Sequence, residues 1–256
     1  MKYKRSKYFT TLNKKKIKYL FTKKNSPITV VFFHGFMSNM TGAKPTAINK
    51  FCKKQKLNFL KFEYSGHGKS TGKFIEGNIT QWTHEAKQLI KSKIDRNNSL
   101  VFIGSSMGSW IALNLFSTFE KQIKGFIGIA SAPEFLEELM WKKFDKKTKN
   151  KIMTEKIYDL EYGGFTYPLT KQLILDGRKN KIFNKRIILK IPVTLFHGLK
   201  DKVVPLSFSR KILKICKKSK KKLIQIKNGD HSLSRKSDLK KICKELKYMI
   251  SSYPES

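Results

Sequence analysis

The sequence has few acidic residues. Aspartate and glutamate number 18 against 55 lysines and arginines, which gives a formal net charge of +37 over 256 residues. Arginine is also scarce, because six of the 55 basic residues are arginine and lysine supplies the other 49. Base reading and bidentate phosphate binding favour the planar fork of arginine. We therefore expect no specific nucleic-acid partner and interpret the charge as compositional drift, although its field should attract anionic substrates.

Cysteine and long apolar runs are scarce too. Cys52, Cys216 and Cys243 are odd in number and far apart, which excludes a disulfide framework and a metal cluster with paired ligands. No apolar run approaches the roughly 18 residues that cross a bilayer, and no apolar signal core follows the basic N-terminus. We predict reduced thiols, no metal, no transmembrane anchor and a cytoplasmic protein. The mitochondrial matrix is the alternative, if the basic N-terminus is a transit peptide.

A G-x-S-x-G motif lies between an apolar run and a helical pattern. Gly104, Ser106 and Gly108 follow the run 100–103 and precede the apolar segment 110–116. In such a strand-to-helix turn the glycines relieve crowding, so that the central serine can project from the sheet edge as a nucleophile. A Ser- and Gly-rich turn without chemistry has the same pattern. The interpretation therefore depends on partners for Ser106.

Short apolar runs alternate with helix-length segments along the chain. After a predicted hairpin of 7–12 and 16–22 come strand candidates at 28–33, 57–63, 100–104, 125–130, 193–197 and 222–226. The helix candidates cover 41–56, 80–94, 107–119, 207–216 and 237–251. This alternation is typical of a mostly parallel sheet with helices on both faces. We predict an α/β class fold as a single domain over residues 1–256.

The segment 133–191 interrupts that alternation. It has no comparable β run, but apolar residues recur at helical spacing near its start, and aromatic residues follow. We predict a mostly helical lid or cap insertion over the sheet. Two additional packing helices would give the same pattern, yet apolar residues above a sheet edge often form an acyl pocket. The candidate pocket residues are Phe135, Leu139, Met140 and Trp141.

Polar residues follow several predicted strands at their C-terminal ends. Ser106, Asp201 and His231 each lie just beyond such an end, and these ends meet at one edge of a parallel sheet. Their order along the chain is the nucleophile, acid and base order of a nucleophile elbow. His231 would take the proton of Ser106, and Asp201 would hold the imidazole in one tautomer. The backbone N–H groups of Phe36 and Met107 are the candidates for an oxyanion hole.

Other acids and histidines compete for these roles. Asp230 adjoins His231 and Asp176 lies in the insertion, but Asp201 is favoured because neighbouring loop residues rarely direct a carboxylate at the next side chain. His84 lies in a polar helical pattern. For the remaining histidines a structural role is favoured over catalysis, namely for His34, His67 and His197.

From residue 28 to 250 the chain resembles the α/β-hydrolase superfamily. Within it, the chain is similar to the subfamily that holds a mitochondrial acyl-glucuronide esterase, also described as a palmitoyl-protein thioesterase, and bacterial relatives. The resemblance lies in the segments 35–44, 62–66, 104–110 and 195–205. It implies an α/β-hydrolase fold with Ser106 as nucleophile, Asp201 as acid and His231 as base.

The resulting hypothesis is a serine hydrolase without a cofactor. It would cleave a carboxylic ester or thioester through an acyl-enzyme, with a small-molecule or lipid-like acyl substrate that the positive field favours when anionic. A serine peptidase or lysophospholipase on the same fold is the nearest alternative. A non-catalytic basic module that binds anionic membrane or nucleic acid is the alternative from another class.

Overall fold

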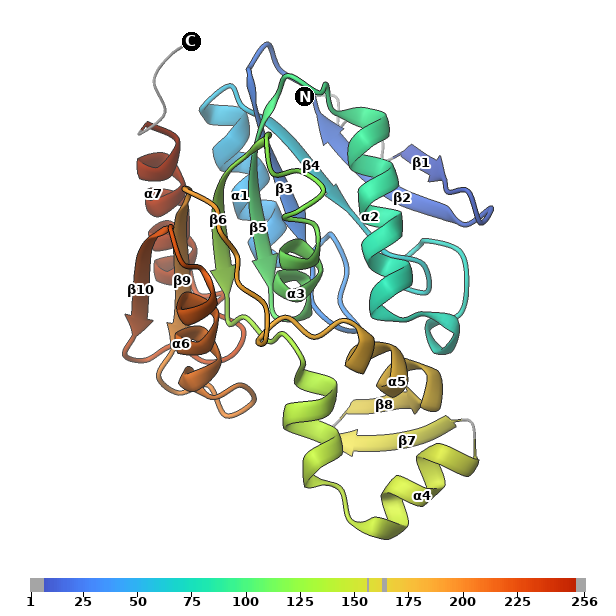
Figure 1. Ribbon diagram of the computed structural model, residues 1–256. Helices are drawn as coiled ribbons and strands as arrows, with labels where there is room; N and C mark the ends of the chain where they lie inside the picture. Colours follow the sequence, from blue (N-terminus) through green and yellow to red (C-terminus); the bar gives the residue numbers. More distant parts are fainter. Residues whose placement is uncertain (1–6, 156, 163–164, 252–256) are drawn as a thin grey trace.

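The computed structural model describes residues 7–155, 157–162 and 165–251 (Figure 1). Eight strands form one sheet in the order β1-β2-β4-β3-β5-β6-β9-β10. The pairs from β4 to β10 are parallel, whereas β1 and β2 join the edge antiparallel. The α/β-hydrolase architecture predicted from the sequence is confirmed. The strands are β1 Lys7–Thr10, β2 Lys16–Thr22, β3 Ile28–Phe33, β4 Asn58–Phe62, β5 Ser99–Ser105, β6 Ile123–Ile129, β9 Pro192–Gly198 and β10 Lys220–Ile226.

The sheet is parallel because its central strands are apolar on both faces. Every residue of β4 is buried, as are nearly all residues of β3, β5 and β9, which requires a layer of helices on each side. The two layers correspond to two clusters of buried side chains. One cluster includes Ile48 of α1 and Leu246 of α7, and the other includes Trp82 of α2, Trp110 of α3 and Ile212 of α6. These helices are α1 Ala43–Lys54, α2 Ile79–Lys93, α3 Met107–Asn114, α6 Leu206–Ile215 and α7 Lys236–Ser251.

Helix α3 is shorter than predicted. The apolar pattern continues to Phe119, but the helix ends at Asn114. Beyond it, Leu115 and Phe116 donate to carbonyls three residues back, so the chain tightens into turns. The turns bring the ring of Phe116 within 5.4 Å of Phe126 and that of Phe119 within 5.9 Å of Phe102, between ring centroids. Packing against the sheet therefore replaces the last predicted helical turns.

The insertion after Pro133 is only partly helical. It contains a π-helical turn η2 at Leu136–Met140, a short turn η3 at Trp141–Lys143 and the helices α4 Lys146–Thr154 and α5 Lys171–Lys179. Between the helices lies an antiparallel pair, β7 Ile157–Tyr162 and β8 Phe165–Thr170, which the sequence analysis did not predict. Leu160 faces Tyr167 in the register, and less exposed residues alternate with exposed ones along β7. That period of two, together with the aromatic content, favours a hairpin over a helix.

The insertion extends beyond the sheet edge at which β3, β5 and β6 end, next to α2 and α3 (Figure 1). Helix α5 contacts both α2 and the π-helical turn, and Asp176 of α5 accepts hydrogen bonds from the N–H and hydroxyl of Thr80 at 2.9 and 2.6 Å. The insertion is thus joined to the sheet domain through partly buried contacts. Within the described residues, no helix has the length and apolar character that a membrane span requires.

Candidate active site

Ser106 lies in a sharp turn between β5 and α3. Its φ of 51° and ψ of −120° belong to a region that L-residues rarely adopt. The flanking glycines allow this turn, because a Cβ at Gly108 would overlap the Phe33 carbonyl oxygen and one at Gly104 would overlap the Ser109 backbone. The Ser106 N–H donates to the Ile129 carbonyl at 2.9 Å. The turn therefore has the elbow geometry expected from G-x-S-x-G.

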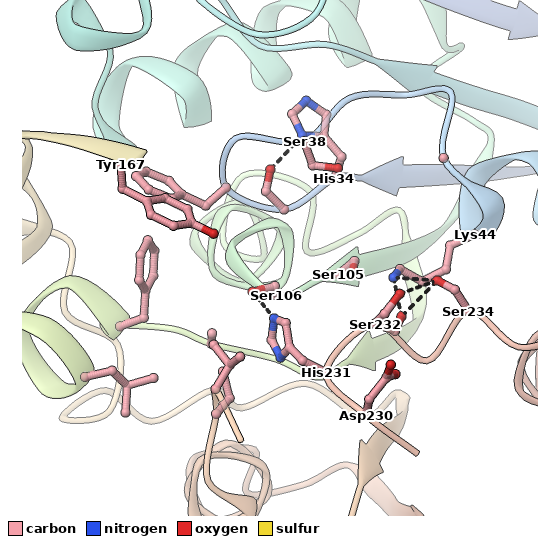
Figure 2. A pocket seen from close by; sticks show the side chains of 18 of the residues that line it. His34, Ser38, Lys44, Ser105, Ser106, Tyr167, Asp230, His231, Ser232 and Ser234 are labelled. Atoms are coloured by element: carbon pink, nitrogen blue, oxygen red, sulfur yellow. Dashed lines mark hydrogen bonds between the residues drawn. The ribbon is translucent and has the colours of Figure 1, made fainter. Parts of the chain in front are cut away.

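Ser106, His231 and Asp201 form a chain of hydrogen bonds. His231 Nε2 lies 3.2 Å from Ser106 Oγ, and His231 Nδ1 lies 2.8 Å from Asp201 Oδ2. The three residues come from the ends of β5, β9 and β10 and are separated by up to 125 positions in the sequence. Figure 2 shows the imidazole directed at the serine hydroxyl. The structure thus brings together the three residues that the sequence analysis selected.

The Asp201 carboxylate is fully buried and well supplied with hydrogen-bond donors. Burial tends to raise its pKa, but the hydrogen bond and charge of His231 and the N–H groups of Val203 and Val204 outweigh that effect and lower it. These two N–H groups donate to Oδ1 at 2.8 and 2.9 Å, which leaves Oδ2 for His231. Asp201 is therefore ionised at neutral pH and orients the imidazole.

The competing acids have other partners. Asp230 accepts from the Leu233 N–H at 2.9 Å and thereby stabilises its own loop. Asp176 is bonded to Thr80 and to Asn180, which ties α5 to α2.

The other histidines have structural surroundings. His197 is buried between the Ser209 hydroxyl at 2.9 Å and the Val204 carbonyl at 3.0 Å, and burial lowers its pKa. His34 is buried, and this burial, with a smaller effect of His67, holds its pKa well below the usual value. Burial also lowers the pKa of His67 to about 4. His84 is exposed on α2. Near the serine, His231 is the histidine within hydrogen-bonding distance.

Two backbone N–H groups beside the serine are available for an oxyanion. Met107 is the first residue of α3, so its N–H has no partner within the helix. Within the described residues, the N–H of Phe36 has no protein acceptor either. Met107 directly follows Ser106 in the chain and Phe36 directly follows Gly35, and both Ser106 and Gly35 line the cavity. A helix N-terminus also favours negative charge.

A cavity of about 1050 Å³ adjoins Ser106 and His231. Its size suits a substrate with a sizeable apolar group. Of the predicted pocket residues, Phe135, Leu139 and Met140 line it. Trp141 does not, because its ring lies under the Arg178 guanidinium, 4.7 Å from the ring centroid.

Several residues of the cavity were not named individually from the sequence, although the later aromatic residues of the insertion were expected as a group to contact the acyl chain. Leu160 and Tyr167 of the hairpin and Phe144 extend the apolar wall, and Lys44 lies at the opposite side of Ser106 from Tyr167 (Figure 2). The aromatic cluster of the insertion was a usable signal for Tyr167. Among 49 lysines, nothing in the sequence distinguished Lys44.

The fold and the elbow define the chain as an α/β hydrolase. It belongs to the family described as "Serine aminopeptidase, S33", whose model matches residues 25–163. The chain is 27% identical over 215 residues to the mitochondrial palmitoyl-protein thioesterase ABHD10 of Bos taurus, covering 82% of this chain and 69% of the relative.

Solved structures show the same fold. A protein from Agrobacterium vitis S4 has a TM-score of 0.90 and 26% identity, covering 96% of this chain and 98% of that chain. The α/β-hydrolase domain-containing protein 10 from mouse has a TM-score of 0.87 and 24% identity, again covering 96% of this chain and 98% of that chain. At this level of identity the mouse structure is evidence for the fold alone.

Proposed function

We propose that this protein is a serine hydrolase that cleaves a carboxylic ester or thioester through an acyl-enzyme, with Ser106 as nucleophile, His231 as base and Asp201 as acid. The observation that carries the proposal is the hydrogen-bond chain from Asp201 through His231 to Ser106 at the wall of a large cavity. Membership of a hydrolase family and the likeness to a thioesterase support the same chemistry.

Acylation begins with transfer of the Ser106 proton to His231. Because Nδ1 donates to the ionised Asp201 over 2.8 Å, Nε2 is the free base, and it lies 3.2 Å from the hydroxyl oxygen. As the imidazole becomes charged, the neighbouring carboxylate stabilises it. The serine oxygen forms a bond to the acyl carbon, and His231 returns the proton to the leaving alcohol or thiol.

The tetrahedral intermediate carries a negative charge on the former carbonyl oxygen. In this proposal the N–H groups of Phe36 and Met107 donate to that oxygen, and removal of one such donor typically costs about 3 kcal/mol of transition-state stabilisation. Water then attacks the acyl-enzyme with His231 again as base, and the acid and free Ser106 are released.

The apolar part of the cavity suits the acyl group. The rings of Phe135 and Tyr167 both pack against Phe36, with centroid separations of 5.1 and 6.1 Å. Each buried methylene contributes about 0.8 kcal/mol, so a medium or long acyl chain would be bound well along this wall.

Labelling by a fluorophosphonate and turnover of p-nitrophenyl acyl esters and acyl thioesters test the proposal. We expect labelling and turnover by the unmodified protein, and loss of both in Ser106→Ala. Ser105→Ala is the matched control, because Ser105 adjoins the elbow but has no hydrogen bond to His231 among the described contacts. Absence of labelling and of turnover in the unmodified protein would refute the proposal.

The nearest alternative is a serine peptidase or lysophospholipase. The family description favours a peptidase, but an aminopeptidase must bind a cationic N-terminus, and the cavity wall contains four lysines and one carboxylate, Asp230. Turnover of aminoacyl anilides or of lysophospholipids faster than of simple acyl esters would favour the alternative.

If the protein is instead a non-catalytic basic module, the Ser106→Ala variant and the unmodified protein should bind DNA or anionic liposomes equally, and neither should hydrolyse an ester.

The cellular compartment is a separate prediction. The composition favours the cytoplasm, whereas the mitochondrial names of the mammalian relatives favour the matrix. Cell fractionation distinguishes the two.

A further inference from the structure

Lys44 occupies a position that disfavours a lysine in two respects. It is the second residue of α1, where the positive end of the helix dipole repels a cation. It also lines the cavity in a partly buried position, and burial lowers its pKa to about 8, against the opposing effect of Asp230. A lysine kept at such a place needs compensating contacts.

These contacts are made with the loop 229–234 that carries His231. Lys44 Nζ donates to the carbonyl oxygen of Ser232 and lies 3.4 Å from the hydroxyl of Ser234. Figure 2 shows the ammonium directed at this loop beside His231. The residues are separated by 188 and 190 positions in the sequence, so the contact joins α1 to the distant end of β10.

Other hydrogen bonds of the loop are short-range or lie before His231: the Ser234 hydroxyl donates to the Ser232 carbonyl at 3.2 Å, and the Lys200 N–H donates to the Gly229 carbonyl at 2.8 Å. Asp230 bonds to the Leu233 N–H within the loop, and Leu233 is buried at a φ of 45°. Ser232 is exposed. Ser232 directly follows His231 in the chain. The ammonium of Lys44 therefore holds the backbone one residue after the histidine.

We propose that Lys44 is a positioning residue for His231, holding the loop 229–234 against α1 through the Ser232 carbonyl so that the imidazole stays within reach of Ser106. This inference rests on the proposed hydrolase function. Displacement of a catalytic group by about 1 Å can cost roughly a hundredfold in rate, and a charge-assisted hydrogen bond is about twice as strong as a neutral one.

The test compares Lys44→Met, Lys44→Arg and Lys50→Met with the unmodified protein. Methionine keeps the length without a donor, arginine keeps the charge, and Lys50 is an exposed lysine on the same helix. We expect Lys44→Met to lower kcat and the rate of fluorophosphonate labelling by tenfold to a hundredfold with KM nearly unchanged. Lys44→Arg should recover most of that loss, and Lys50→Met should equal the unmodified protein.

A second readout is the pH profile of kcat/KM. The ammonium of Lys44 loses its proton above about pH 8, so the unmodified protein should lose activity severalfold there, and Lys44→Arg should not. The charged or titratable groups that line the same cavity are Asp230 and His231 on the loop and Lys143, Lys200 and Lys202 on the wall, and all are unchanged in this variant. This readout does not depend on whether Lys44→Met folds.

The outcomes separate the two proposals. If the unmodified protein is active and folded Lys44→Met has an unchanged kcat, the role of Lys44 is overturned and the hydrolase function stands. A raised KM at constant kcat in this variant would also overturn the positioning role, because it would indicate that Lys44 binds the substrate. An alkaline loss that persists in Lys44→Arg would also overturn it. No labelling of the unmodified protein would overturn both the positioning role and the hydrolase function.

Discussion

Ser106 is held in a conformation that a serine rarely adopts. A positive φ of this kind costs on the order of 1 to 3 kcal/mol, so the surrounding contacts must compensate. The Ser109 hydroxyl donates to the Gly104 carbonyl at 2.8 Å, and the Ser131 hydroxyl donates to Ser109 at 2.8 Å. These buried bonds tie the elbow to the strand before it and to the end of β6. The neighbours of Ser106 therefore hold the backbone from which its hydroxyl projects, and the hydroxyl itself contacts His231.

His67 is a second residue whose surroundings predict a measurable effect. Its ring packs against Trp82 at 5.0 Å and Phe74 at 5.1 Å, and its Nε2 is buried without a partner among the described residues. The pKa of His67 is about 4 in the folded protein, against an ordinary value of 6.5. As the pH falls, His67 is therefore protonated in the unfolded chain before it is protonated in the folded protein. Stability should therefore fall as the pH drops from 6.5 to 4, by up to about 3 kcal/mol.

We expect His67→Phe to reduce this loss. Phenylalanine keeps the ring contacts, and the Ser65 carbonyl that His67 contacts retains a donor in Trp82 Nε1 at 3.1 Å. The measurement is the free energy of unfolding in urea at pH 7 and pH 4.5. His84→Gln, at an exposed site, should leave the difference between the two pH values unchanged. An equal difference in His67→Phe and the unmodified protein would contradict the prediction.

At the scale of elements, the π-helical turn and the hairpin β7–β8 both contribute to the apolar wall of the cavity, beside Phe36, Phe135 and Phe144. Leu139 lies in the turn, and Leu160 and Tyr167 lie opposite each other in the hairpin. Two local structures thus contribute to one wall of the cavity beside Ser106. The length of the acyl group should depend on side-chain volume there.

We expect Leu139→Trp to shorten the accepted acyl chain. The larger ring would occupy space in the cavity, and each methylene that no longer binds costs about 0.8 kcal/mol, or roughly fourfold in kcat/KM. Values of kcat/KM for acetate, octanoate and palmitate esters of p-nitrophenol measure this effect. Palmitate should lose most and acetate little. Leu175→Trp, at an exposed position on α5, should leave kcat/KM for all three esters unchanged. An equal loss of kcat/KM for all three esters in Leu139→Trp would contradict the prediction that this wall binds the acyl chain.

At the scale of the whole molecule, the net charge of +37 is reflected in the basic wall of the cavity beside Ser106. Lys143, Lys200 and Lys202 lie on its wall in addition to Lys44. Such a field raises the encounter rate of anionic substrates and is screened by salt, with a Debye length of about 10 Å at 0.1 M and 3 Å at 1 M.

We therefore expect salt to affect anionic and neutral substrates differently. The kcat/KM for a ring-carboxylated analogue of p-nitrophenyl butyrate should fall severalfold between low salt and about 1 M KCl, while that for p-nitrophenyl butyrate itself stays nearly constant. Equal salt dependence of the two esters would show that the lysines do not steer the substrate.

The sequence determined the alternation of strands and helices and the residues at the strand ends. Continuous apolar runs and the two glycines around Ser106 are local patterns, so β3, β5 and the elbow could be predicted from them. Parallel pairing then placed Ser106, Asp201 and His231 at one edge, because the carboxyl ends of parallel strands meet there.

The tertiary structure alone decided the wall of the cavity and the neighbours of His231. The hairpin β7–β8 replaced an expected helix because its alternating side chains pack on one face, and Trp141 turned to Arg178 away from the cavity. Lys44 meets Ser232 across 188 positions. The contacts of Trp141 and Lys44 depend on how distant segments pack together, and no periodicity or motif within one segment encodes them.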